Sequence, residues 1–405
     1  MSISHDLLRH VEYVQQCLSN DKKPIGLFLG AGCPVSIKTG DKDSPPLIPD
    51  IRGMTESVCD KLAKCKECGP LLDLINSHFK EDRRLSINIE DMLSHVRALR
   101  SVAGKSIVRN MTSVDLDKLD AAICLEIEQL TNKELPNVGT PYHQIAAWVG
   151  GTIREKPVQF FTTNYDLLLE KALEDCEVPY FDGFVGARRP FFDVQAMELD
   201  ELPARWARLW KLHGSVNWYQ SDSRRVYRSM SAEKGARRVI HPSHLKYEES
   251  RTMPYFAMID RLRSFLKQST ATLVISGYSF RDGHLNREIV HGLHGNATAI
   301  VFALLFGKMD CYEEAIGLAI NRPNLTLLAD DGAVIGGQRA PWSDRDGDPS
   351  DEGLCMWSSW TKIKPEDENS RSTGKLLLGD FTVLGHFVQA LVGRVLPGME
   401  SINAK

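Results

Sequence analysis

The chain has 405 residues, and the usual size of roughly 100 to 200 residues per domain predicts two or three structural units. Hydrophobic residues make up 42% and charged residues 25%, which are ordinary globular values that exclude a disordered or fibrous protein. The net charge of -4 lacks the basic excess typical of nucleic-acid binders, so direct binding of DNA or RNA is disfavoured.

The first segment and the cysteines indicate where the protein works. Residues 5–18 have the spacing of an amphipathic helix with charged residues interleaved, unlike the apolar run of a secretory signal. No stretch of the sequence approaches the roughly 18 apolar residues of a membrane span. Nine cysteines without framework spacing are expected to stay reduced. We therefore expect a cytoplasmic protein that does not associate with membranes.

The first third of the chain predicts one strand and a long helical insert. Residues 25–29 have a buried-strand pattern that ends at Gly30-Ala31-Gly32. Residues 37–47 are polar and rich in turn formers, and we interpret them as a mobile loop over a pocket. Between about 54 and 150, apolar residues recur at spacings of three and four. This pattern predicts a helical lid or subdomain.

The rest of the chain alternates apolar strands with helices. Strands are expected at residues 158–162, 209–212, 272–276, 299–305 and 324–329, and helices near 167–175, 255–268, 283–293 and 311–320. This alternation predicts an α/β fold with a Rossmann-like, doubly wound, mainly parallel sheet. Residues 220–250 are polar and are expected to form a hairpin or surface loop.

The C-terminal part changes in composition. Residues 336–374 are polar and turn-rich, which is typical of a linker, and residues 381–393 predict an amphipathic docking helix. We therefore divide the chain into residues 1–335, with the insert at about 54–150, and residues 336–405. The second part is expected to be a linker and a short C-terminal extension for docking or oligomerisation.

Two of the predicted strands break into turns that contain glycine. Such a turn lets backbone amides approach a pyrophosphate, since glycine has no Cβ. Gly30-Ala31-Gly32 lacks the third glycine and the acidic residue of the dinucleotide fingerprint, so a tight turn without nucleotide explains this motif better when it is taken alone. In the second turn, Gly277-Tyr278-Ser279-Phe280, the hydroxyl could contact a phosphate or ribose. Its two aromatic rings could stack on a base or belong to the core.

Polar side chains follow two further strands. Asn164 and Asp166 come after residues 158–162, where side chains project into a crevice at the sheet edge, but both residue types also cap helices. His213 follows residues 209–212, and its ordinary pKa suits proton transfer. The alternative is a buried histidine satisfied by a carbonyl. Cys65 and Cys68 have the spacing of metal ligands, but a structural zinc site needs four, so we expect free thiols and no metal.

Read in order, GAG, IPDIR at 48–52, TTNYD at 162–166, LHGS at 212–215 and GYSF at 277–280 resemble the NAD-binding and catalytic signature of the sirtuin superfamily. The resemblance covers roughly residues 24–305. It implies that Asn164, Asp166 and His213 are catalytic. It also implies an NAD site formed by Gly30, Ala31, Gly32, Pro49, Asp50, Arg52, Thr163, Gly277, Tyr278, Ser279 and Phe280.

One departure from that family concerns the zinc ribbon of the protein deacylases. Residues 214–275 contain no cysteine, so the ribbon's two Cys-x-x-Cys pairs are missing. TTNYD, LHGS and GYSF are instead similar to a bacterial branch that cleaves NAD in antiphage defence. The chain length and the segments LADDGAVIGG and LLLGDF resemble the stand-alone sirtuin subunit that works with a HerA-type ATPase.

The resemblance implies an NAD hydrolase that cleaves the nicotinamide–ribose bond to give nicotinamide and ADP-ribose. We expect NAD as the substrate, a homo-oligomer, and activation by assembly with a partner ATPase during abortive infection. The helical insert or the loop at 37–47 would restrain the resting enzyme. Two alternatives remain: a zinc-free protein deacylase or ADP-ribosyltransferase, and a non-catalytic subunit that senses NAD or ADP-ribose.

Overall fold

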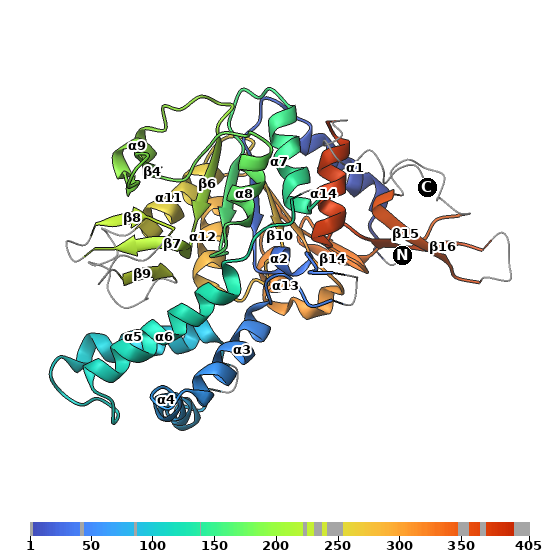
Figure 1. Ribbon diagram of the computed structural model, residues 1–405. Helices are drawn as coiled ribbons and strands as arrows, with labels where there is room; N and C mark the ends of the chain where they lie inside the picture. Colours follow the sequence, from blue (N-terminus) through green and yellow to red (C-terminus); the bar gives the residue numbers. More distant parts are fainter. Residues whose placement is uncertain are drawn as a thin grey trace.

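A nine-stranded sheet forms the centre of the molecule (Figure 1). The computed structural model describes residues 3–40, 44–84, 87–137, 139–221, 225–230, 237–240, 254–346, 356–364 and 370–392. The sheet has the order β14-β13-β12-β11-β10-β1-β2-β6-β3. Its strands are β1 (Ile25–Leu29), β2 (Gln159–Thr162), β3 (Tyr180–Phe181), β6 (Ala207–Lys211), β10 (Thr272–Ser276), β11 (Ile300–Leu304), β12 (Leu325–Ala329), β13 (Gly332–Ile335) and β14 (Gln338–Pro341).

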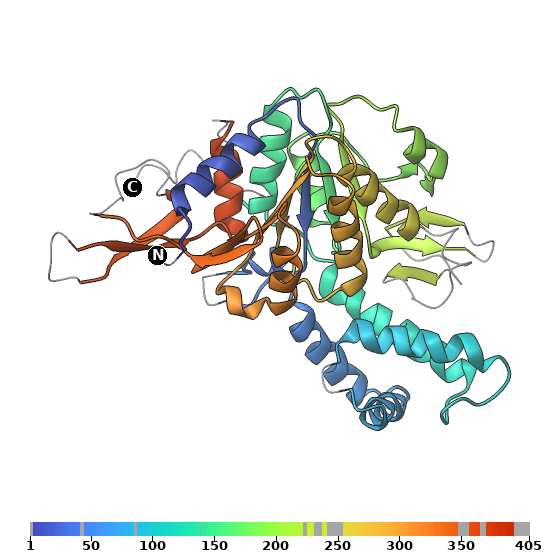
Figure 2. The same ribbon diagram turned by 180° about the vertical axis from the view of Figure 1, so that it is seen from behind.

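Alternating side chains of the buried strands pack into two separate hydrophobic clusters. In β1, Leu27 and Leu29 belong to one cluster and Phe28 to the other, since successive residues of a strand face opposite sides. The first face is covered by α1 (Leu7–Leu18), α7 (Pro141–Gly151), α8 (Leu168–Asp175) and α14 (Phe381–Ala390). The second face is covered by α11 (Pro254–Leu266), α12 (Gly283–His294) and α13 (Glu313–Ile320), as Figure 2 shows. The predicted doubly wound α/β architecture is thus confirmed.

The direction of the strands defines a switch point in the sheet. The neighbouring strands β12, β11, β10, β1, β2, β6 and β3 pair in parallel, whereas β13 and β14 form an antiparallel hairpin at one edge. From β1 the chain first builds the β2 side, and it later returns to place β10 against the other side of β1. In open α/β sheets, ligands bind outside the carboxyl ends of the strands at such a point.

Four helices form an arm that extends away from the sheet (Figures 1 and 2). They are α3 (Ile51–Lys64), α4 (Gly69–Glu81), α5 (Ile89–Ala103) and α6 (Ser113–Thr131). Within the arm, the Arg97 guanidinium of α5 pairs with Asp120 of α6 at 2.5 Å. The helical pattern expected over residues 54–150 is present, and its last helix, α7, packs against α14 on the sheet.

A second sheet lies beside the first, in the order β4-β5-β8-β7-β9. Its strands are β4 (Phe184–Val185), β5 (Phe191–Phe192), β7 (Gly214–Gln220), β8 (Val226–Arg228) and β9 (Arg237–Ile240). The strands β8 and β9 come from the polar region expected as a hairpin or loop, and both pair antiparallel with β7. Residues 222–224, 231–236 and 241–250 of that region lie outside the described residues.

The segment expected to be a linker contains regular structure in its described parts. β14 extends the main sheet, and β15 (Ser358–Lys362) pairs with β16 (Ser372–Leu376). These strands had no clear periodic pattern because the polar, turn-forming residues between them dominate the composition. Residues 347–355 and 365–369 lie outside the described residues. The division of the chain at residue 335 stays a prediction.

The remaining elements are short helices: α2 (Gly32–Val35), α9 (Val194–Leu199) and the 3-10 helix η1 (Met309–Cys311).

The loop at 37–47 is held at its base, where the Leu47 amide donates to the Ile37 carbonyl at 2.7 Å. Its residues 41–43 lie outside the described residues. Among the helices that the structure describes, none has the length and apolar character to cross a lipid bilayer.

Candidate functional site

The two glycine turns pack directly against each other at the switch point. A Cβ on Gly30 would lie 2.4 Å from the Gly277 carbonyl oxygen, and one on Gly32 would lie 2.8 Å from the Gly277 Cα. Gly277 itself has a φ of +66°, and its Cβ would lie 2.6 Å from the Cys33 nitrogen. Glycine is therefore required at all three positions for the turns to meet.

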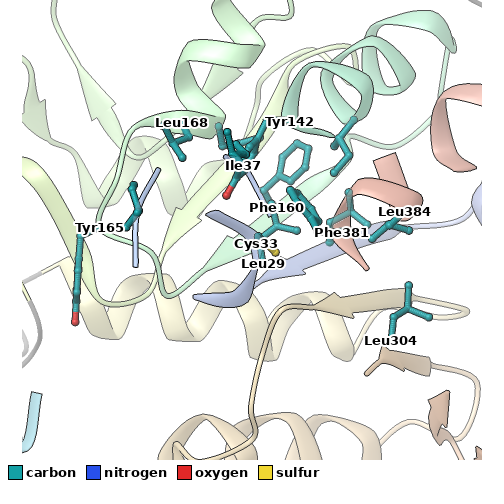
Figure 3. Packing of buried hydrophobic residues seen from close by; sticks show 14 of the residues in the cluster. Leu29, Cys33, Ile37, Tyr142, Phe160, Tyr165, Leu168, Leu304, Phe381 and Leu384 are labelled. Atoms are coloured by element: carbon teal, nitrogen blue, oxygen red, sulfur yellow. The ribbon is translucent and has the colours of Figure 1, made fainter. Parts of the chain in front are cut away.

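The same contact engages two of the turn amides. The Gly30 amide donates to the Ser276 carbonyl at 2.9 Å, and the Gly32 amide donates to the Gly277 carbonyl at 2.8 Å. These two amides are thus used to join β1 to the β10 turn. Ala31 and Gly32 are exposed at the tip, where α2 begins. Figure 3 shows Cys33 turning inward from this point, beside Leu29 in the core.

Asn164 reaches the glycine turn from the end of β2. Its Nδ2 donates to the Gly30 carbonyl at 3.1 Å, and its backbone amide donates to the Thr162 hydroxyl at 3.0 Å. The side chain is 9% exposed. Capping of α8 is therefore not its role in this structure, because its amide group binds across the crevice to β1. Thr163, which is also predicted to belong to this site, is half-buried.

Asp166 is buried beside an ion pair. Its Oδ1 accepts from the Leu168 amide at 3.1 Å, the first amide of α8, whose N-cap residue is Leu167. Burial raises the pKa of Asp166 to about 6, although the Lys211 ammonium opposes that shift. The Lys211 Nζ donates to the Asp166 carbonyl and lies 2.8 Å from Glu170 Oε1. A carboxyl group with a pKa near neutrality is typical of functional sites.

His213 crosses the crevice from β6 to the β10 side. Its Nε2 donates to Asp282 Oδ2 at 3.2 Å, so a carboxylate satisfies this histidine where a carbonyl was the alternative expectation. Asp282 is the N-cap of α12, and its Oδ1 accepts from the His284 amide at 2.8 Å. The hydrogen bond and charge of His213, together with these backbone hydrogen bonds, hold the pKa of Asp282 well below its usual range, despite its burial.

Glu90 belongs to this site and was not predicted from the sequence. Glu90, in the first turn of α5, accepts a hydrogen bond from the Tyr165 hydroxyl, and its Oε1 lies 3.9 Å from His213 Nδ1. Asn88 and Asp91 form a capping box that marks the start of α5. That local signal locates Glu90 on the helix, but its contact with His213 depends on how the arm packs.

The aromatic residues of the second turn lie in the core. Tyr278 is 8% exposed and Phe280 is 0% exposed, and their ring centroids are 4.8 Å apart. The Tyr278 hydroxyl donates to Asn286 Oδ1 at 2.9 Å. The core interpretation of these rings is therefore the one that the packing supports. Ser279 between them is exposed.

The residues of the IPDIR string form the start of α3. Asp50 is its N-cap and accepts from the Gly53 amide at 2.8 Å, while Pro49 is half-buried just before it. The Arg52 side chain is 85% exposed and pairs with Glu56 at 3.0 Å. The contacts of these residues are therefore those of a helix start and its exposed first turn.

Cys65 and Cys68 lie at the junction of α3 and α4. The Cys68 amide donates to the Cys65 sulfur at 3.4 Å, and both cysteines are free thiols. Hydrogen bonds from the Cys68 and Glu67 amides lower the pKa of Cys65. Across the described ranges, no three His, Cys, Asp or Glu side chains gather as metal ligands would.

Comparison with known proteins gives a match over the second half of this site. Residues 158–315 match the family model described as the SIR2-like domain, and this span includes TTNYD, LHGS and GYSF. Among solved structures, one comes from work on the mechanism and regulation of Sir2 enzymes. It is 11% identical to this chain, with a TM-score of 0.33, and the match covers 75% of this chain and 90% of that structure's chain. Another, from work on sirtuin substrate affinity, is 13% identical, with a TM-score of 0.33, and covers 72% of this chain and 85% of its own. No curated protein matches the sequence.

Proposed function

We propose that the protein is an NAD hydrolase that cleaves the bond between nicotinamide and ribose. The observation that carries the proposal is a pair of contacts at the carboxyl edge of the sheet, where Asn164 binds the Gly30 carbonyl of the GAG turn and His213 binds Asp282 after β10. The match of residues 158–315 to the SIR2-like domain supports NAD as the substrate.

A buried hydroxyl at the end of β10 is available to bind the ribose and nicotinamide side of such a substrate. The Ser276 hydroxyl, buried at the end of β10, has no hydrogen-bond partner within the described residues, as is typical of a group that a ligand can satisfy. Ala31, Gly32 and Ser279 are exposed at the two turns and would lie nearest the pyrophosphate and adenosine. Pro49, Asp50 and Arg52 would join the site only after a change in the start of α3.

The proposed reaction breaks the bond from ribose C1′ to the nicotinamide nitrogen. Both bonding electrons leave with nicotinamide, and the positive charge develops on the ribose as an oxocarbenium-like state. Water then adds to C1′ and loses a proton, giving ADP-ribose. His213 would accept that proton or one from a ribose hydroxyl, Asn164 would position the water or ribose, and Asp166 would stabilise the ribose side.

Water is the proposed acceptor because this chain builds a different module where sirtuin deacylases have a zinc ribbon. The stretch after His213 forms β7, β8 and β9 and contains no cysteine. A deacylase would leave NAD largely intact without an acylated peptide, and a sensing subunit would bind NAD without releasing nicotinamide. Incubation of the purified protein with NAD alone therefore separates the three functions.

The catalytic assignment has a direct test. Asn164→Ala and His213→Ala should each lower NAD cleavage by about 100-fold or more, the usual contribution of positioned acid–base groups. His294→Ala changes an exposed histidine on α12 and serves as the matched control. Circular dichroism must show that each variant is folded. A folded His213→Ala variant with the parent rate would remove His213 from the mechanism.

We also propose that the enzyme acts in antiphage defence as an assembly with a HerA-type ATPase. The support is the likeness of TTNYD, LHGS and GYSF to the defence branch, and the need to restrain an enzyme that depletes NAD. Co-expression with such an ATPase, followed by size-exclusion chromatography and an NAD assay, tests it. Failure of the two chains to co-elute, with no change in NAD cleavage, would contradict the partner.

A further inference from the structure

The first turn of α5 brings the helical arm into contact with the catalytic edge of the sheet. Two contacts fix this turn in place. Asn88 caps α5, and the Ile89 amide donates to the Thr55 hydroxyl of α3 at 3.0 Å. Glu90, the next residue, is therefore carried by a rigid part of the arm. Its side chain is 26% exposed and faces the loops that follow β2 and β6.

Glu90 contacts two residues of the candidate site. Its Oε1 accepts a hydrogen bond from the Tyr165 hydroxyl of the TTNYD string, which orients the carboxylate. The same oxygen lies 3.9 Å from Nδ1 of His213. On the other side of the ring, Nε2 donates to Asp282 at 3.2 Å. The imidazole thus lies between one carboxylate from the arm and one from α12.

We propose that Glu90 is a positioning residue through which the arm controls His213: with α5 docked, Glu90 and Asp282 together hold the ring as an imidazolium, which cannot accept a proton. Displacement of α5 removes one of the two carboxylates and frees the imidazole to act as a base. This inference rests on the proposed function, and it assigns the restraint to one side chain of the arm.

The charges around the ring support this arrangement. Burial disfavours the imidazolium, but the hydrogen bond to Asp282 and the charges of Glu90 and Asp282 outweigh it, so the pKa of His213 is raised. Asp282 is a carboxylate, since its own pKa is lowered. The nearby phenols of Tyr165 and Tyr278 have raised pKa values and stay neutral.

The raised pKa of His213 has a consequence for the proposed reaction. A general base must be deprotonated, and a raised pKa lowers the fraction of neutral imidazole at any pH below it. Docking of α5 therefore suppresses proton acceptance, and its removal restores it. The arm would then act on the chemistry without covering the substrate.

Glu90→Gln tests the proposal because glutamine keeps the size and the acceptor oxygen for Tyr165 but removes the charge. Glu81→Gln makes the same change at the end of α4, where Glu81 pairs with Arg109 at 3.2 Å and is 65% exposed. The His213 imidazole is titrated by NMR in the full chain labelled at histidine nitrogens, with His213→Ala used for assignment. Glu90→Ala provides a second variant.

We expect the pKa of His213 to fall by about one unit in Glu90→Gln, a tenfold shift in the protonation equilibrium, and to stay unchanged in Glu81→Gln. The acid limb of the pH profile of NAD cleavage should move by the same amount to lower pH. The rate on that limb should therefore rise up to about tenfold.

The outcomes separate a failure of the inference about Glu90 from a failure of the proposed function. An unchanged His213 titration in both Glu90 variants overturns the inference, whatever the activity. A lowered pKa with an unmoved acid limb also overturns it, because Glu90 would not act on the reaction. If the pKa falls as expected but neither the parent nor any variant cleaves NAD, the contact stands and the proposed function fails.

Discussion

The buried pair of Lys211 and Glu170 makes a quantitative prediction about the framework of the site. Lys211 is 1% exposed and its Nζ lies 2.8 Å from Glu170 Oε1, whose side chain is 11% exposed. At that distance the gross attraction is about 6 kcal/mol for an effective dielectric constant of about 20. Lys211→Met removes one charge and leaves the other buried. Such a change costs about 3–5 kcal/mol of unfolding free energy.

The double variant Lys211→Met with Glu170→Leu is the decisive comparison. Because it removes both partners of the ion pair, it should be more stable than either single variant, with a loss of about 2 kcal/mol or less. Urea denaturation followed by circular dichroism gives the three free energies for a double-mutant cycle. If the loss in the double variant equals the sum of the two single losses, the pair is not coupled and the reasoning is refuted.

Two further predictions concern the glycine turn and the exposed thiols. Gly30→Ala should lower the unfolding free energy by about 1–3 kcal/mol because its Cβ would lie 2.4 Å from the Gly277 oxygen. Gly283→Ala, whose Cβ meets nothing within 4 Å, should change it little, and equal denaturation midpoints would contradict this packing. Cys65, whose pKa is lowered by backbone hydrogen bonds, should react with iodoacetamide faster than Cys311, which is also exposed. Peptide mass spectrometry measures both rates, and equal rates would contradict the assigned environment of Cys65.

The sheet and the strand ends were predictable because their signals are local. The apolar run 25–29 and the glycines that follow it specify a buried strand and a tight turn wherever they occur. The same holds for the run at 272–276. Since parallel strands end at one edge, Asn164 and His213 could be expected to lie near each other before any coordinates were known.

The contacts that decide between alternatives depend on tertiary packing and could not be predicted from local patterns. Asn is favoured as a helix cap, yet Asn164 binds the Gly30 carbonyl because β2 lies next to β1. The rings of Tyr278 and Phe280 could stack on a base or pack in the core, and in the structure both belong to the second hydrophobic cluster. Glu90 is 123 positions before His213, and only the packing of the arm brings them together.

The central claim is that the strand-end residues form a site at which NAD is cleaved by water. The most direct test follows NAD, nicotinamide and ADP-ribose by chromatography in one time course, for the parent protein and for His213→Ala, with and without a HerA-type ATPase. The account predicts that the parent forms nicotinamide and ADP-ribose in equal amounts as NAD disappears, and that His213→Ala forms neither. Intact NAD with the parent protein under both conditions would contradict it.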